Sequence, residues 1–140
     1  MNSRASQLQP AVDQARQRSE DALSQLATQQ QALARAEHQL SELRRYRAEY
    51  AASGEATLSV NAMLNRQSFV QRIDQAITQQ LAEIARHQRQ LEHVRDHWKH
   101  SHARESALDS VVAQHLERER RAEERREQAE LDERSQYRRS

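Results

Sequence analysis

The sequence predicts an all-α fold in which two long helices form an antiparallel coiled-coil hairpin, the second helix longer than the first. The 140 residues contain one glycine, Gly54, and one proline, Pro10, and these two residue types interrupt helices most strongly. Hydrophobic residues make up 36% of the chain and charged residues 31%, a balance that fills a narrow two-helix interface but not a wide core. The apolar residues are also periodic, which favours a folded helical chain over a disordered one.

The first helix is expected over about residues 7–52. A proline is tolerated in the first turn of a helix, so Pro10 fits near its start, and Gly54 fits the turn beyond its end. A heptad repeat, typical of supercoiled helices, can be laid over this stretch. Its a positions are Val12, Ser19, Leu26, Leu33, Leu40 and Arg47, and its d positions are Ala15, Ala22, Gln29, Ala36, Leu43 and Tyr50.

The second helix is expected over about residues 66–135, after a connection at residues 53–65. The connection is short, mixed in composition and rich in residues that cap helices, such as Ser59 and Asn65. A second heptad repeat follows it. Its a positions are Val70, Ile77, Ile84, Leu91, Trp98, Glu105 and Val112, and its d positions are Ile73, Gln80, His87, Val94, Ser101 and Leu108.

The two heptad repeats fit each other in an antiparallel register. In such a hairpin each a position faces a d position of the other helix. One register satisfies the whole length and centres the turn near Val60, inside the expected connection. The facing residues then include Leu43 with Ile77, Ala36 with Ile84, Leu26 with Val94, Ala22 with Trp98, and Val12 with Leu108. We therefore expect one coiled-coil domain over residues 1–140.

From about residue 115 the second helix has no partner left within the chain. This stretch alternates acidic and basic residues, with Glu117 and Arg121, and Arg126 and Glu130, spaced four residues apart. Pairs at this spacing stabilise a helix weakly. The sequence therefore leaves two interpretations of this charged overhang: a solvated single helix, or a helix that docks into another protein.

The composition excludes several classes of function. With 22 Lys and Arg against 21 Asp and Glu, the formal net charge is +1, too small to hold nucleic acid. The chain has no cysteine, no apolar run of the ~20 residues that a membrane span needs, and no motif for catalysis or cofactor binding. We expect a cytoplasmic non-enzyme without a cofactor. The histidines His93, His97 and His100 share a helix face, and we interpret them as solvated residues rather than metal ligands.

Large apolar side chains gather near the turn. Tyr46, Tyr50, Phe69 and Ile73 all fall near the ends of the helices that meet there, and two helices cannot bury all of them. Exposed apolar groups mark protein-binding sites, and tyrosine is favoured at interfaces. The alternative is that these residues only clamp the end of the hairpin. The arginines around them are Arg44, Arg45, Arg47, Arg66 and Arg72.

At these residues the chain resembles the flagellar export protein FliJ family. The segments that carry the resemblance are 36–40, 46–50 with its two tyrosines, 65–69, 75–79 and 130–133, together with Trp98. The match extends over roughly residues 36–134. The resemblance implies an antiparallel coiled coil that serves the flagellar type III export apparatus.

The resemblance also implies partners. Proteins of this family resemble the central stalk of rotary ATPases, engage the hexameric export ATPase and promote its assembly. They also link it to the membrane protein of the export gate and handle export chaperones. Membrane association would then run through partners only, at the cytoplasmic face of the inner membrane. Carried over by position, the gate-binding residues are Gln39, Leu43, Tyr46, Tyr50, Phe69, Ile73 and Ala76.

For the ATPase ring, the resemblance points to the charged overhang. The residues we expect to contact the ring are Glu117, Arg121, Arg125 and Glu130. The chain departs from the family pattern at Gln80, where the family has histidine. Two alternatives stay open: the equivalent stalk protein of a virulence injectisome, or a structural coiled-coil scaffold. A scaffold predicts a dimer, whereas a self-contained hairpin predicts a monomer.

Overall fold

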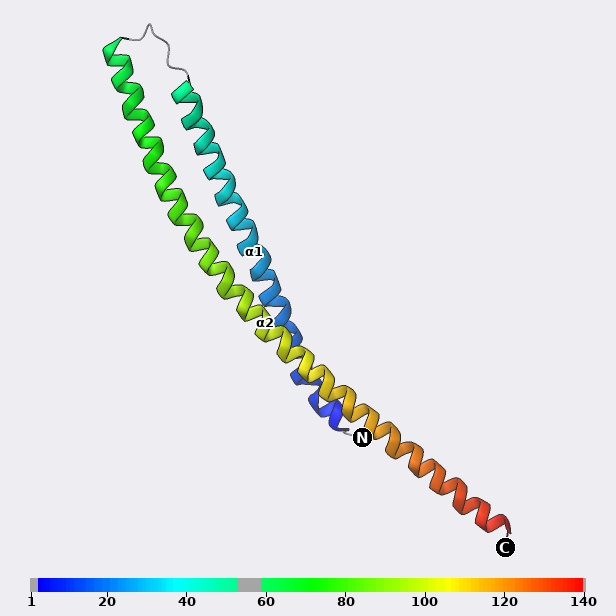
Figure 1. The fold of residues 1–140 in the computed structure, drawn as a ribbon. Coiled ribbons are helices and arrows are strands. Elements are labelled where there is room, and N and C mark those ends of the chain that lie inside the picture. Colours follow the sequence, from blue (N-terminus) through cyan, green and yellow to red (C-terminus); the bar gives the residue numbers. More distant parts are fainter. Residues whose placement is uncertain (1–2, 53–58, 140) are drawn as a thin grey trace. The chain divides into compact units, whose positions relative to one another are not determined.

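The structure, a computed structural model, describes residues 3–52 and 59–139, without the side chain of Arg139. These residues form two helices, α1 (Arg4–Ala52, 49 residues) and α2 (Val60–Arg139, 80 residues), and no strand occurs among them. The two helices pack against each other in antiparallel directions (Figure 1). The expected all-α hairpin with a longer second helix is therefore confirmed.

Helix α1 begins at Arg4, three residues before the expected start. Ser3 provides the cap: its Oγ accepts a hydrogen bond from the amide of Ser6 at 3.0 Å, and its carbonyl accepts one from Gln7 at 3.0 Å. A serine cap satisfies amides that the first turn cannot pair internally. Pro10 consequently lies inside the helix and not in its first turn, which corrects the sequence-based expectation.

Helix α2 also begins earlier than expected, at Val60. Ser59 caps it, because its Oγ accepts a hydrogen bond from Ala62 N at 3.2 Å and its carbonyl accepts one from Met63 N at 3.0 Å. The expectation that residues 60–65 belong to the connection is therefore wrong, while residues 53–58, including Gly54, lie outside the described residues. Helix α2 ends at Arg139, beyond the expected position near residue 135.

The contacts divide the chain into two compact units, which we describe separately. Unit 2 is Ala22–His97, and unit 1 combines Met1–Asp21 with Trp98–Ser140. The expectation of one domain over the whole chain stays a prediction. The pairing of Ala22 with Trp98 also stays one, since these two residues belong to different units.

In unit 2 the helices run side by side along a narrow apolar seam (Figure 1). Its core cluster consists of Ala36, Leu40 and Ile84, which are 5%, 8% and 8% exposed, with Leu33 and Ile77 packed against it. Ala36 and Ile84 are facing positions in the register expected from the sequence. The antiparallel pairing of the two heptad repeats is therefore present in this unit.

In unit 1 the beginning of α1 packs along α2 with smaller residues. The buried residues of α1 here are Ala5, Val12, Ala15 and Ser19. Arg16 reaches α2, with Nε 3.8 Å from Glu105 Oε1 and Nη2 4.0 Å from Asp109 Oδ1. The expected register places Arg16 opposite Arg104, so Glu105 and Asp109 lie one and five residues beyond the facing position.

The overhang begins later than the sequence indicated. Half-buried residues of α2 continue to Ala122, and the described side chains from Glu123 onward are all exposed. The expected start near residue 115 is about two turns too early, because α1 begins at Arg4 and its buried Ala5 stands opposite His115 in the register. Below, "overhang" means residues 123–139 of α2.

Candidate functional site

The residues expected to bind the export gate lie in unit 2, near the facing ends of α1 and α2. We call them the tip surface: Gln39, Leu43, Tyr46, Tyr50, Phe69, Ile73 and Ala76. The structure divides them by exposure. Ile73 is buried in the seam, Leu43 and Ala76 are half-buried, and Gln39, Tyr46, Tyr50 and Phe69 are exposed. The four exposed residues are accessible to a partner, whereas Ile73 is not.

The aromatic side chains of the tip surface come from both helices. The rings of Tyr50, on α1, and Phe69, on α2, have centroids 4.5 Å apart and planes inclined by 35°, a favourable aromatic pair. Both rings nevertheless keep more than a third of their surface exposed, at 37% and 40%, and Tyr46 is 50% exposed. The pair therefore clamps the two helices and still presents apolar surface to solvent, so the clamp and the binding surface are not exclusive alternatives.

An ion pair between the helices lies within the tip region. Arg47 occupies an a position of α1, where an apolar residue is usual, and its guanidinium pairs with the carboxylate of Asp74 on α2. A second contact joins Arg47 Nη2 to Asp74 Oδ2 at 3.4 Å. The hydrogen bond to Asp74, together with the attraction of its charge, raises the pKa of Arg47 above its ordinary value. An ion pair thus joins α1 and α2 near their facing ends, although both of its side chains are about half exposed and such pairs contribute little to stability.

Gln80 orients one member of the tip surface. This half-buried residue of α2 donates two hydrogen bonds from Nε2, one to the carbonyl of Ala36 at 2.9 Å and one to Gln39 Oε1 at 3.0 Å. Gln39 is thereby held on the side of α1 that faces α2. This role of Gln80 was not expected from the sequence, although a polar residue at a d position opposite Leu40 is the signal that could have indicated it.

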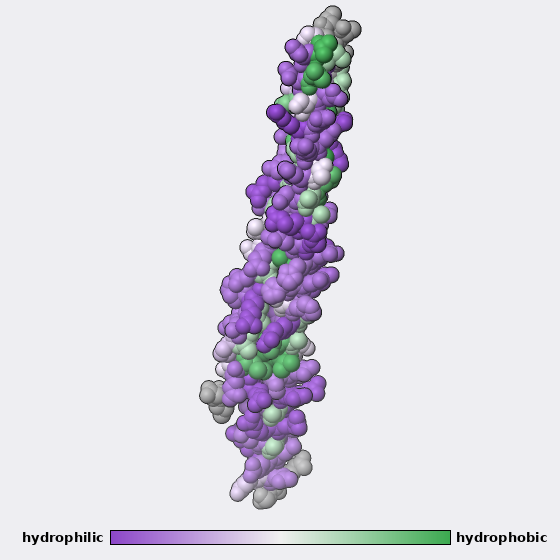
Figure 2. Space-filling model, turned by 90° about the vertical axis from the view of Figure 1, so that its left-hand side faces the viewer, coloured by the Kyte–Doolittle hydropathy of each residue, from purple (hydrophilic) through white to green (hydrophobic). Residues whose placement is uncertain are grey.

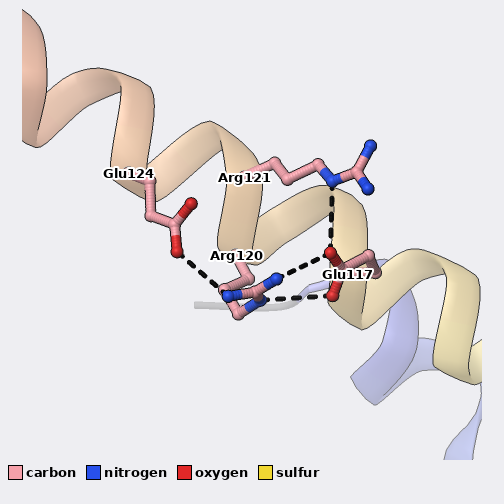
Figure 3. Close-up of polar contacts among 4 residues, drawn as sticks. All are labelled: Glu117, Arg120, Arg121 and Glu124. Atoms are coloured by element: carbon pink, nitrogen blue, oxygen red, sulfur yellow. Dashed lines mark hydrogen bonds and ion pairs between the residues drawn. The ribbon is translucent and has the colours of Figure 1, made fainter.

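The residues expected to contact an ATPase ring lie along the C-terminal part of α2. Glu117 is half-buried, and Arg121, Arg125 and Glu130 are exposed. Figure 3 shows how the first of them are linked: Arg120 lies between Glu117 and Glu124, and Arg121 reaches back to Glu117. The nitrogen–oxygen distances are 2.7 Å from Arg120 to Glu117, 3.0 Å from Arg120 to Glu124 and 3.1 Å from Arg121 to Glu117.

These pairs all form within one helix. The expected pair of Glu117 and Arg121 is present, whereas Arg126 pairs with Glu123 at 3.3 Å in place of the expected Glu130. The hydrogen bond from Arg120, followed by the contact with Arg121, lowers the pKa of Glu117 below its ordinary value. The arginine side chains of these pairs stay largely exposed and the contacts lie within α2, so the pairs support the helix without joining it to α1.

The described residues contain no group of three His, Cys, Asp or Glu side chains placed to hold a metal ion. His93, His97 and His100 are exposed on α2. That they are solvated residues stays a prediction. Within the described part of the chain, neither helix has a segment of the length and apolarity needed to cross a bilayer.

Comparison with known proteins gives one match. The family model described as "Flagellar FliJ protein" matches residues 4–140, nearly the whole chain. No curated protein and no solved structure matches the sequence. The match includes the tip surface, the seam and the overhang.

Proposed function

Because the chain belongs to the flagellar FliJ protein family, it is a component of flagellar type III export, and we propose that it joins the export ATPase to the export gate. In this proposal the C-terminal part of α2 engages the ATPase hexamer and promotes its assembly and activity. The tip surface binds the membrane protein of the gate. The family is one of non-enzymatic export components, so the chain would act on its partners through binding alone.

The observation that carries the proposal is the exposed helical overhang. Every described side chain from Glu123 onward is exposed, yet α2 continues as a helix to Arg139. A helix with charged residues on all of its sides is typical either of a solvated helix or of one that enters another protein. A helix of about 10–12 Å diameter with side chains fits a narrow protein channel, and the alternating charges on it can pair with both acidic and basic lining residues.

The tip surface supports the second contact. Tyrosine is among the residues that contribute most to protein interfaces, and Tyr46, Tyr50 and Phe69 are at least one third exposed. Tyr50 and Phe69 already contact each other across the two helices, with ring centroids 4.5 Å apart. A surface that is already ordered before binding loses little conformational entropy on association, which favours this end of unit 2 as a docking site.

Further parts of the proposal follow from the family. We place the protein in the cytoplasm at the inner face of the inner membrane, bound there through its partners, and we assign it the handling of export chaperones. We expect a monomer in solution, since the apolar seam is filled by the chain's own two helices in both units. The family match is to the flagellar protein, which favours flagellar export over a virulence injectisome.

The proposal is tested by the ATP hydrolysis rate of the cognate export ATPase. The rate is measured alone, with the full chain, and with a variant truncated after Leu116, which lacks Glu117, Arg121, Arg125 and Glu130. The full chain should raise the rate, and the truncated chain should leave it at the level of the ATPase alone. The matched control is the full-length double variant Tyr50→Ala and Phe69→Ala, which keeps the overhang and should still stimulate. Full stimulation by the truncated chain would exclude the assignment of ring binding to this segment.

A further inference from the structure

Three polar residues at d positions interrupt the apolar seam of unit 2. Each of them stands opposite a leucine in the observed register: Gln29 opposite Leu91, His87 opposite Leu33, and Gln80 opposite Leu40. A polar group that leaves water costs free energy unless it finds a hydrogen bond, and a leucine side chain offers none. The hydrogen bonds of these three residues therefore indicate how well the observed register suits the seam.

Only one of the three polar residues is fully provided for. Gln80 donates two hydrogen bonds to α1, at 2.9 Å and 3.0 Å. Gln29 Oε1 and His87 Nδ1 are buried and have no hydrogen-bond partner in the described part of the chain. The other ring nitrogen of His87 lies 3.7 Å from Glu83 Oε2, on the same helix. Since nearly all buried polar atoms of folded proteins are paired, the observed register leaves two layers of the seam unsatisfied.

A slide of half a heptad brings the two unsatisfied residues level with each other. Gln29 now stands opposite Leu91, and His87 is four residues nearer the beginning of α2. Half a heptad corresponds to about 5 Å, at about 1.5 Å per residue. A glutamine amide carries both a donor and an acceptor, so Gln29 can pair with Nδ1 of His87 whichever ring nitrogen holds the proton. We call this alternative the displaced register.

The displaced register also keeps the large apolar residues of the seam matched. In it a positions stand level with a positions, and d positions with d positions. The level apolar pairs are Leu26 with Leu91, Leu33 with Ile84, Leu40 with Ile77, and Leu43 with Ile73. Gln80 comes level with Ala36, whose carbonyl it already reaches in the observed register. None of the three polar residues then faces a leucine.

The observed register is favoured by contacts near the facing ends of the helices. The slide separates the rings of Tyr50 and Phe69, whose centroids are 4.5 Å apart, and it breaks the ion pair of Arg47 with Asp74. Aromatic pairs and exposed ion pairs each contribute modestly. These losses are of the same order as the gain from pairing two buried polar atoms, so the two registers are close in free energy.

The outer surfaces of the helices do not distinguish the two registers. The face of the molecule in Figure 2 is mostly hydrophilic, with small green areas, as expected when the apolar side chains line the seam. A slide along the helix axes leaves these outer side chains in water. In unit 1 the residues that α1 buries are small apart from Val12, so few large side chains interlock there to oppose a slide.

We propose that the seam of unit 2 has two registers, the observed one and the displaced one, in which α1 has moved by half a heptad toward its own C-terminal end and Gln29 pairs with His87. Packed helices switch between discrete arrangements of this kind rather than deform continuously. The slide moves Tyr46 and Tyr50 by about 5 Å relative to Phe69, so the tip surface has a different shape in each register. The proposal concerns the chain alone and holds whichever partner binds the tip surface.

The experiment measures the distance between two nitroxide labels on the full-length chain by double electron–electron resonance. The chain has no cysteine, so Gln31→Cys and Gln71→Cys, at two exposed positions, carry the only labels. Along the helix axis these positions are about 27 Å apart in the observed register and about 22 Å apart in the displaced one. We expect both distances in the original sequence, and a single distance would overturn the proposal.

The variant Gln29→Leu tests the polar pair within the labelled chain. It puts a leucine opposite Leu91 in the observed register and opposite His87 in the displaced one, so the shorter distance should disappear. The matched control is Gln30→Leu, at the exposed neighbouring position, which should keep both distances. Circular dichroism checks that each variant stays helical. A shorter distance that persists in Gln29→Leu would overturn the pairing of Gln29 with His87.

The variant Asp74→Ala tests whether the two distances are two registers. It removes the ion pair with Arg47, which the slide breaks, and should raise the ratio of the shorter to the longer distance about two- to fivefold. The matched control is Glu42→Ala, which removes only pairs within α1, with His38 and Arg45, and should leave the ratio unchanged. Equal ratios in the two variants would show that the distances are not two registers of this seam, and would overturn the proposal.

Discussion

Unit 2 and the overhang of unit 1 are both helical, but different interactions keep them so. In unit 2 several contacts cross between α1 and α2: the hydrogen bond from Gln80 to Ala36, the ion pair of Arg47 with Asp74, and the apolar core cluster. In the overhang the contacts stay within α2, for example from Gln128 to Asp132 at 3.1 Å. Tertiary packing thus stabilises the first region, while local propensity and i,i+4 pairs stabilise the second. A helix that needs no packing partner has its whole surface available for another protein.

The largest expected effect comes from removing apolar volume in the seam. Ile84 is 8% exposed in the core cluster with Ala36 and Leu40. Ile84→Ala should lower the free energy of unfolding by about 2–5 kcal/mol, because a cavity forms in a packed core. Leu131→Ala in the overhang, where the side chain is 58% exposed, should change it by less than about 0.5 kcal/mol. Urea titration followed by circular dichroism measures both, and equal effects would remove the distinction between the two regions.

A smaller effect is expected from the polar position within the same seam. Gln80→Ala removes two hydrogen bonds, to Ala36 and to Gln39, and should lower the free energy of unfolding by about 1 kcal/mol. Gln80→Leu puts an apolar side chain at the same d position and should be neutral or stabilising, because the accepting carbonyl of Ala36 keeps its helix hydrogen bond. If Gln80→Ala proved more stable than the unchanged chain, Gln80 would not contribute to pairing through these bonds.

The smallest expected effect is the loss of helical signal in acid that follows from protonation of Glu117 on α2. The contacts of Glu117 with Arg120 and Arg121 lower its pKa in the folded chain. A depressed carboxylate pKa stabilises the folded state above the ordinary value of about 4.3, and this stabilisation is lost as the pH falls through the lowered value. The helical signal should therefore drop slightly in acid, below about pH 4, and less so in Glu117→Gln.

Glu130→Gln serves as the control for this titration, since no ion pair of Glu130 is present among the described contacts. Glu130→Gln should lose as much helical signal in acid as the original chain does. A drop of the same size in Glu117→Gln would show that the local pairs around Glu117 do not support the helix.

The seam was the most predictable part of the structure, because the period of the apolar residues determines which side of each helix is buried. Ala36 and Ile84 face each other as the heptad register required, and the aromatic rings near the turn stay partly exposed, as expected for two helices alone. The same reasoning failed at the helix ends. There one serine cap decides the starting residue, at Ser3 and at Ser59, and periodicity carries no information about caps.

Side-chain pairing was also less predictable than the backbone. The pattern placed Arg47 in the seam but did not show that it would turn to Asp74, and it did not show that Gln80 would reach the carbonyl of Ala36. Both depend on the reach of long side chains rather than on spacing. The identity of the partners came from the family resemblance and not from geometry, since exposed tyrosines indicate a protein interface without indicating which protein.

Hydrogen exchange of the full-length chain, alone and with the assembled export ATPase, tests the central proposal most directly, because one measurement follows both regions. Helices without tertiary packing exchange quickly on their own. We predict that the ATPase slows exchange across residues 117–133 and leaves exchange in residues 33–50 and 69–84 unchanged. Slowed exchange confined to the tip surface, or no change in residues 117–133 when the ATPase is bound, would contradict the assignment of the C-terminal part of α2 to the ATPase ring.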